Sequence, residues 1–210
     1  MKYMGMPAGM WYLFLPSFRK NLNDVLGFEK EEAEKITRKA KDEYKRIIEK
    51  LPEFEKGDRF KMNIISCAML SSFILNMDRK PSVQEMEKYY NDAMMVPFMK
   101  WFCKKMGKKK FSQSDLNGME KTAKLNAADR NPYSWNMDLL PYEDGSGYEA
   151  RFYHCGICTL MKELGTDEYT SAMCKLDYAM AEAGGVCDFI REYTLASGGP
   201  YCDCAYKKKI

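Results

Sequence analysis

Thiols gather in the last third of this chain, where six of its eight cysteines lie. Thiolates are metal ligands and nucleophiles, so such a group is a candidate centre of chemistry. The spacing Cys155-x2-Cys158 is typical of a zinc knuckle, and Cys202-x-Cys204 adds further thiols. A zinc ribbon usually has two C-x2-C pairs and this chain has one. Zinc is therefore a candidate cofactor, and its candidate ligands are Cys155, Cys158, Cys174 and Cys202.

A carboxylate and an arginine accompany these thiols. Cys174 and Asp177 stand three residues apart in a predicted helix at 168–183, which places them on one face. They are candidates for metal ligands or for nucleophile and base, or else a buried thiol beside a solvated carboxylate. Arg191 interrupts an apolar strand pattern and needs a counter-charge. That charge is either an acidic residue of the chain or a carboxylate ligand held by the guanidinium fork.

The strands that carry the arginine are predicted at 188–196 and 201–207, as a hairpin around Ser197-Gly198-Gly199-Pro200. With a four-residue loop, Leu195 opposes Cys202 and Tyr193 opposes Cys204. Alternation then places both thiols on the face of the arginine. A slip of one residue would reverse this arrangement.

Four further residues receive roles from the same pattern. Tyr193 shares the face of the arginine and is a candidate substrate-binding residue. Thr194 and Asp203 fall on the opposite face, where we expect them to orient the site from behind. His154 is also a candidate supporting residue. It precedes Cys155 in a predicted strand, so the two side chains point to opposite faces and cannot readily bind one ion.

The elements that must position these residues fall into two parts. Residues 1–130 are predicted to be helical and residues 131–210 to be an α+β region rich in cysteine, packed together as one domain. Pro97 is expected to kink or divide the third helix. The predicted helices of the first part span 28–50, 59–77, 82–106 and 112–129. In the second part a strand at 148–155 precedes the helix and the hairpin.

Composition limits the classes of partner. The chain has no 18-residue apolar run, so we expect no membrane partner. The apolar run at 10–15 follows Pro7 and is followed by Pro16; we interpret it as mature protein, with a signal peptide as the alternative. Eight cysteines without an export signal predict a reduced, soluble, cytoplasmic protein. The basic residues of the first half lack an accompanying basic–aromatic motif, so no nucleic-acid partner is expected.

The order of these residues resembles a known family. The pattern is Cys155, then Lys162-Glu163-Leu164-Gly165, then Cys174-x2-Asp177, then Arg191-x2-Thr194-x3-Gly198-x3-Cys202-Asp203. Over about residues 148–206 it is similar to the L-2-amino-thiazoline-4-carboxylic acid hydrolase family. Gly156 departs from the proline common there, and Cys158, Cys187 and Cys204 are additional. The closing strands also look like the 4-vinyl-reductase-type ligand-binding domain.

The resemblance implies a hydrolase that opens a small cyclic C–N/C–S compound, such as 2-amino-thiazoline-4-carboxylate, to a carbamoyl cysteine. Its implied partner is a small molecule with a carboxylate, which Arg191 would grip, and the oligomeric state stays open. The catalytic candidates are Cys155, Cys174, Asp177 and Cys202. Two other classes remain open on the same scaffold: a non-catalytic binding or sensor module, and a structural zinc-thiolate domain.

Overall fold

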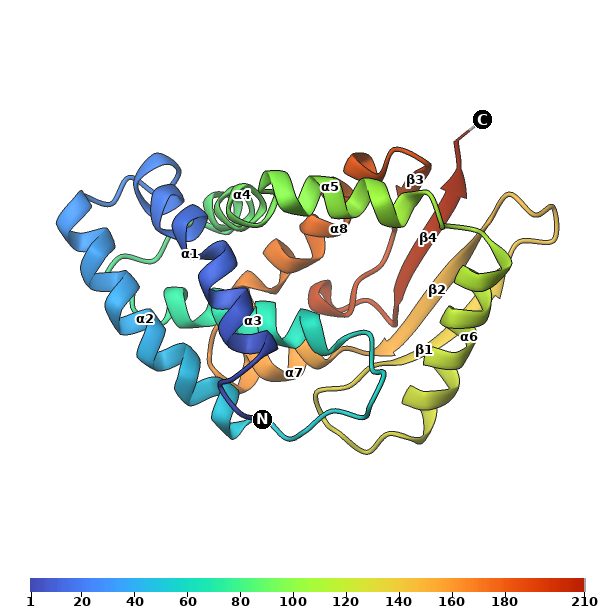
Figure 1. The fold of residues 1–210 in the computed structure, drawn as a ribbon, viewed down its shortest axis with the longest axis horizontal. Helices are drawn as coiled ribbons and strands as arrows, with labels where there is room; N and C mark the ends of the chain where they lie inside the picture. The colour runs from blue at the N-terminus through green and yellow to red at the C-terminus, as the bar shows by residue number, and fades with distance from the viewer. Residues whose placement is uncertain (210) are drawn as a thin grey trace.

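The structure is a computed structural model, and it describes residues 1–209 (Figure 1). Its first part is helical, as predicted. The helices are α1 Met6–Asp24, α2 Lys30–Lys50, α3 Lys61–Ile74, α4 Val83–Met94, α5 Pro97–Gly107 and α6 Gln113–Ala128. Pro97 divides the predicted third helix into α4 and α5 because it lacks the N–H that would continue α4. Ser82 and Glu85 form the capping box that begins α4.

The second part mixes strands and helices, which confirms the α+β class. It consists of β1 Asn136–Pro141, β2 Gly147–His154, α7 Gly156–Glu163, α8 Thr170–Gly184, β3 Cys187–Ile190 and β4 Cys202–Lys208. Short 3-10 turns, η1 Asp167–Tyr169 and η2 Leu195–Ser197, separate some of them. The strands form one sheet in the order β1-β2-β4-β3, and every neighbouring pair is antiparallel.

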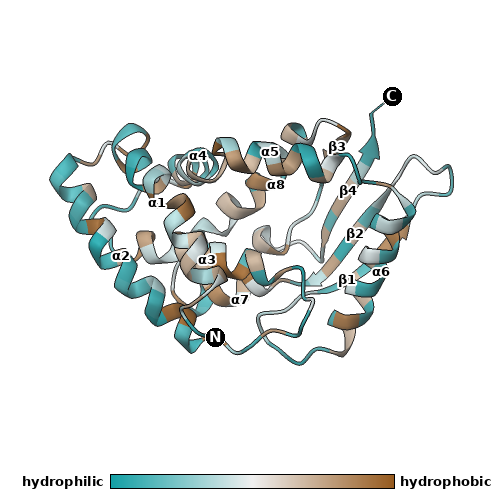
Figure 2. Ribbon diagram, in the orientation of Figure 1, coloured by the Kyte–Doolittle hydropathy of each residue, from teal (hydrophilic) through white to brown (hydrophobic). Residues whose placement is uncertain are grey.

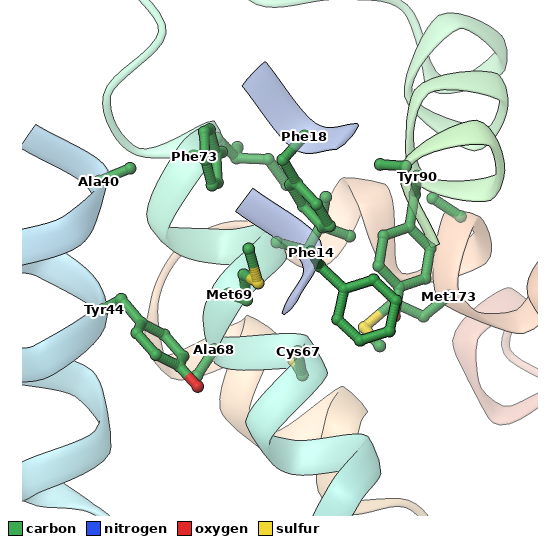
Figure 3. Packing of buried hydrophobic residues seen from close by; sticks show 14 of the residues in the cluster. Phe14, Phe18, Ala40, Tyr44, Cys67, Ala68, Met69, Phe73, Tyr90 and Met173 are labelled. Carbon is green, nitrogen blue, oxygen red and sulfur yellow. The ribbon is translucent and has the colours of Figure 1, made fainter. Parts of the chain in front are cut away.

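The larger core lies among the helices. α3 has apolar residues nearly all round and lies centrally, between α1, α2 and α7 in Figure 1. α2 turns a hydrophilic face outward (Figure 2). On its inner face Tyr44 points toward α3 (Figure 3), and the ring of Trp11 stacks on the ring of Tyr44 at a centroid distance of 5.2 Å. Met173 of α8 belongs to the same core, so residues on both sides of Asn131 share it. The run at 10–15 is thus helical, with its apolar residues Trp11 and Phe14 fully buried.

A smaller core covers one face of the sheet. It contains Ala150 of β2, Phe189 of β3 and Cys204 of β4, packed against Met119 of α6 and Ala181 of α8. The sheet therefore presents one face to the helices, and the face carrying the thiols of β4 is the covered one. This burial determines the environment of any chemistry on that face.

The hairpin predicted around 197–200 is wrong in its extent and register. β3 ends at Ile190, which pairs with Ala205. The next residues leave the sheet because Leu195–Ser197 coil into η2, so the predicted pairs of Leu195 with Cys202 and of Tyr193 with Cys204 do not form. The predicted face is confirmed for the arginine, because Arg191 directly follows the end of β3 and its Nη1 lies 3.8 Å from Cys204 Sγ.

The strand β1 has no counterpart in the prediction. Pro132, Pro141 and the Gly145-Ser146-Gly147 turn made residues 131–147 look like a connection. β1 lies at the edge of the sheet, where Pro141 ends it without losing an interior hydrogen bond. In the described part of the chain, no helix combines the length and the apolar character that crossing a membrane would take.

Candidate functional site

The centre of the site is an ion pair between β3 and α8. Arg191 Nη1 donates to Asp177 Oδ2 at 2.8 Å, and Nη2 donates to the carbonyl oxygen of Cys174 at 2.6 Å. A third contact joins Nη1 to Cys204 Sγ at 3.8 Å. The chain itself thus supplies the counter-charge that the buried arginine requires. Arginine has five N–H donors, so two remain after these three contacts.

The two partners differ in their access to solvent. The side chain of Arg191 is 5% exposed, whereas that of Asp177 is 42% exposed. Burial raises the pKa of Asp177, and the neighbouring guanidinium lowers it in part. The aromatic rings of Tyr178 and Phe189 lie 5.3 and 5.1 Å from the guanidinium carbon and help to enclose it. The arginine therefore holds a carboxylate that the protein encloses but that keeps part of its surface accessible.

A loop built by the motif residues holds the arginine in place. Asp203 of β4 accepts hydrogen bonds from the backbone N–H groups of Glu192, at 2.9 Å, and Tyr193, at 2.6 Å. Cys202 Sγ accepts the N–H of Leu195 at 3.2 Å. Both β4 residues thus satisfy donors that the end of β3 leaves unpaired. This places Asp203 behind the arginine.

The same loop explains two other motif positions. Thr194 caps η2, since its hydroxyl oxygen accepts the N–H of Ser197 at 3.1 Å. Gly198 has a φ of 81°, a left-handed conformation that favours glycine. A Cβ on Gly199 would lie 2.9 Å from the carbonyl oxygen of Thr194. The motif spacing from Arg191 to Cys202 therefore corresponds to the loop that connects β3 to β4.

Cys155 approaches the site from α7, whose N-cap it is. Its thiol interacts with that of Cys158, which raises the pKa of Cys155, and burial raises it further. The N–H groups of Ile157 and Cys158 act in the opposite direction. The charges of Cys155 and Cys202 also act on Cys174, so thiols from the start of α7, from α8 and from β4 lie in the same part of the fold.

Burial keeps these thiols protonated at neutral pH. It raises the pKa of Cys174 to about 12, although Arg191 opposes the shift. The pKa values of Cys202 and Cys204 are raised for the same principal reason. A thiolate nucleophile is therefore not the resting form of any of these three groups. The thiols of the site are, at rest, neutral proton donors.

The described residues show no zinc site of the predicted kind. Within residues 1–209, no three His, Cys, Asp or Glu side chains gather in a group that could hold a metal ion. The guanidinium of Arg191 contacts Cys174 and Cys204, and its charge opposes the rise in the pKa of both thiols. The grouping of Cys155, Cys158, Cys174 and Cys202 as metal ligands therefore stays a prediction.

Two predicted site residues lie away from the ion pair. Tyr193 is 38% exposed and packs its ring on Tyr201 at 5.6 Å, because the strand that would have aimed it inward ends at Ile190. His154 ends β2, and its Nδ1 lies 2.9 Å from the carbonyl oxygen of Ser134. Its ring therefore joins β2 to the segment before β1 and does not reach Asp177.

Sequence reasoning omitted two residues that touch the arginine. Cys204 was left out of the candidates, although alternation along β4 already placed it on the same face as Cys202. The hydroxyl of Tyr178 donates to the Arg191 carbonyl oxygen at 3.4 Å. The signal in the sequence was its position, directly after the candidate Asp177 in the predicted helix. Two surface hollows, of about 260 and 340 Å³, border none of the site residues; Lys30 lines the first and Lys109 the second.

Comparison with known proteins supports the motif. The family model described as L-2-amino-thiazoline-4-carboxylic acid hydrolase matches residues 62–206. The chain belongs to this family. The match includes α3 to α6 and so extends well before the 148–206 segment whose motif first indicated the family. Neither the curated proteins nor the solved structures contain a match, so the likeness to the 4-vinyl-reductase-type domain stays a prediction.

Proposed function

We propose that this chain hydrolyses a small cyclic compound containing C–N and C–S bonds, such as 2-amino-thiazoline-4-carboxylate, to a carbamoyl cysteine. Membership of the family supports the reaction class. The observation that carries the proposal is the ion pair, in which a buried Arg191 holds an accessible Asp177 among protonated thiols. Such a carboxylate can bind a substrate and accept a proton.

The accessible carboxylate suits the ring of the substrate. A cyclic isothiourea carries N–H groups and becomes a cation when protonated, so it complements the charge of Asp177. The two N–H groups of Arg191 that the chain does not use can receive the substrate carboxylate. Because the Arg191 side chain is 5% exposed, we assign its main role to positioning Asp177.

The proton transfers follow from these states. Asp177 removes a proton from water as the oxygen adds to the ring carbon between sulfur and nitrogen. One ring bond from that carbon then breaks as the carbonyl forms, and the proton of the added hydroxyl passes to the ring nitrogen. The leaving sulfur or nitrogen receives a further proton from the Cys174 thiol, three residues away on α8. The proton held by Asp177 returns to Cys174. One water is consumed, and both side chains regain their resting forms.

The test is turnover of 2-amino-thiazoline-4-carboxylate, with carbamoyl cysteine measured by mass spectrometry. Asp177→Asn keeps the shape but removes the base, and we expect kcat/KM to fall about a hundredfold or more. Cys174→Ser should lower kcat with little change in KM. The exposed control Lys109→Ala should behave like the unsubstituted chain. Unchanged turnover in Asp177→Asn refutes the assignment, and binding without turnover across several cyclic amidines would favour a binding module.

A further inference from the structure

Polar atoms without partners concentrate in one place remote from the ion pair. Among residues 1–209, eleven buried side-chain nitrogen and oxygen atoms have no hydrogen-bond partner, and six of them belong to two segments of the chain. Those segments are the loop before α3 and the stretch from the end of α6 to β1. The six atoms are Asp58 Oδ2, Asn126 Oδ1 and Nδ2, Asp129 Oδ2, Asn131 Nδ2 and Ser134 Oγ. Each such atom costs about 1–3 kcal/mol unless a water or an ion satisfies it.

Two of these atoms are carboxylate oxygens on neighbouring side chains. Asp58 Oδ1 accepts the N–H of Phe60 at 2.7 Å, and Asp129 Oδ1 accepts the N–H of Asn131 at 2.9 Å. The second oxygen of each carboxylate is buried and unpartnered. The segments that carry these residues lie side by side, because Phe60 packs on Trp135 at a ring distance of 5.1 Å and a Cβ on Gly118 of α6 would lie 3.5 Å from Arg59 Nη1. The charge of Asp129 acts on Asp58, in agreement with this arrangement. Neither forms an ion pair with a lysine or arginine of residues 1–209.

Neutral oxygens border the same pair. Ser134 is 3% exposed, and its hydroxyl approaches Asp58 closely enough to lower the pKa of that carboxyl, although too loosely for a regular hydrogen bond. Asn126 is fully buried with both amide atoms unpartnered. It precedes Asp129 by one helical turn at the end of α6, so both side chains leave one face. The group thus contains two acidic and two neutral oxygen donors from these two segments.

We propose that Asp58, Asp129, Ser134 and Asn126 bind one hard divalent cation of the Ca²⁺ or Mg²⁺ class. Oxygen donors alone, without thiol or imidazole, select such ions. Two carboxylates match the double charge, and water can complete the coordination shell. The ion would join the loop before α3 to the segment that leads into β1. It would therefore couple the helical half to the sheet, independently of the proposed hydrolysis.

The position of Trp135 gives a direct readout. This residue follows Ser134, is 5% exposed and packs on Phe60 at a ring distance of 5.1 Å. Tb³⁺ bound at the proposed site should therefore emit when tryptophan is excited, and added Ca²⁺ or Mg²⁺ should displace it; the ion that competes at the lower concentration identifies the preferred cation. Trp135→Phe should abolish most of the emission while calorimetry with Ca²⁺ still reports binding. Emission that persists in Trp135→Phe would place the ion elsewhere and overturn the proposal.

Charge-removing variants complete the experiment. Asp58→Asn and Asp129→Asn should each weaken Ca²⁺ or Mg²⁺ binding at least about tenfold in calorimetry of the full chain. The matched control Asp138→Asn, an exposed acid of β1, should bind like the unsubstituted chain. Thermal unfolding in chelator tests whether each variant folds, so lost binding can be separated from lost structure. Absence of saturable binding to either ion at about 1–10 mM, or variants that bind normally, would overturn the proposal.

Discussion

Two regions of this protein bury carboxylates, and they compensate the charge in different ways. At the sheet, Asp177 lies 2.8 Å from a guanidinium that the chain provides. At the start of α3, Asp58 and Asp129 each keep one buried oxygen without a regular hydrogen bond. The first region is complete in itself and leaves an accessible carboxylate for chemistry. The second lacks a positive charge, and so it is the one that calls for an ion from solution.

The contrast also separates two uses of backbone donors. Both carboxylate oxygens of Asp203 accept hydrogen bonds, from the backbone N–H groups of Glu192 and Tyr193, and these bonds fix the loop that follows Arg191. In Asp58 and Asp129 only Oδ1 accepts a backbone N–H, and Oδ2 is buried without a regular hydrogen bond. A carboxylate with both oxygens occupied is a structural anchor, while one with a buried free oxygen is a candidate ligand. The following changes test this distinction.

The largest effect is expected from Asp177→Ala. It leaves the guanidinium of Arg191 buried without its counter-charge, which typically costs about 3 kcal/mol of unfolding free energy or more. Urea denaturation measures this, and Asp177→Ala combined with Arg191→Met should recover much of the loss. If the double variant shows only the sum of the two single effects, the pair is not coupled and the comparison fails.

A smaller loss is expected from Asp203→Asn. The amide keeps one acceptor oxygen, but one of the two N–H groups at Glu192 and Tyr193 loses its partner, at a cost of about 1.5–3 kcal/mol for a bond to a charged group. Urea denaturation gives the free energy, and hydrogen exchange of the two amides reports the loop. Asp188→Asn, an exposed acid of β3, is the control. Equal stability of the two variants would show that Asp203 is no anchor.

Alkaline pH should weaken the fold through its buried thiols. The unfolded thiol of Cys174 ionises near its ordinary pKa of 9.0, whereas burial raises its pKa in the folded chain to about 12. As pH rises through this interval the unfolded state loses its proton first, so stability falls, by about 1 kcal/mol per thiol between pH 9 and 10. Cys174→Ala should fall less steeply with pH than the unsubstituted chain. Parallel pH profiles would contradict the shift.

The smallest effect separates the two regions by its sign. In chelator, Asp58→Asn removes the repulsion between Asp58 and Asp129. The free energy of unfolding should then rise by less than about 1 kcal/mol, which appears as a slightly higher midpoint of thermal unfolding. Asp177→Asn removes an attraction and should lower it. Matching signs for the two variants would mean that the carboxylates at α3 do not repel each other in the metal-free chain.

Local pattern predicted much of the fold. Helical periodicity located α2, α3 and α6, and Ser82 with Glu85 marked the beginning of α4. It failed at β1, an edge strand with few buried residues, and at the closing hairpin, where η2 interrupts the alternation after Ile190. Alternation reports the face of a side chain only while the strand continues, so Tyr193 could not be placed from it.

The order of residues by itself determined the α+β class, the family and the face shared by Arg191 and the thiols of β4, because each depends on spacing along the chain. Only the tertiary structure decided that Arg191 pairs with Asp177, since helix and strand patterns fix direction and leave the partner open. It alone brought Asp58 next to Asp129, 71 positions away in the chain. Contacts between distant segments depend on how the helical half packs against the sheet, and no local pattern encodes that packing.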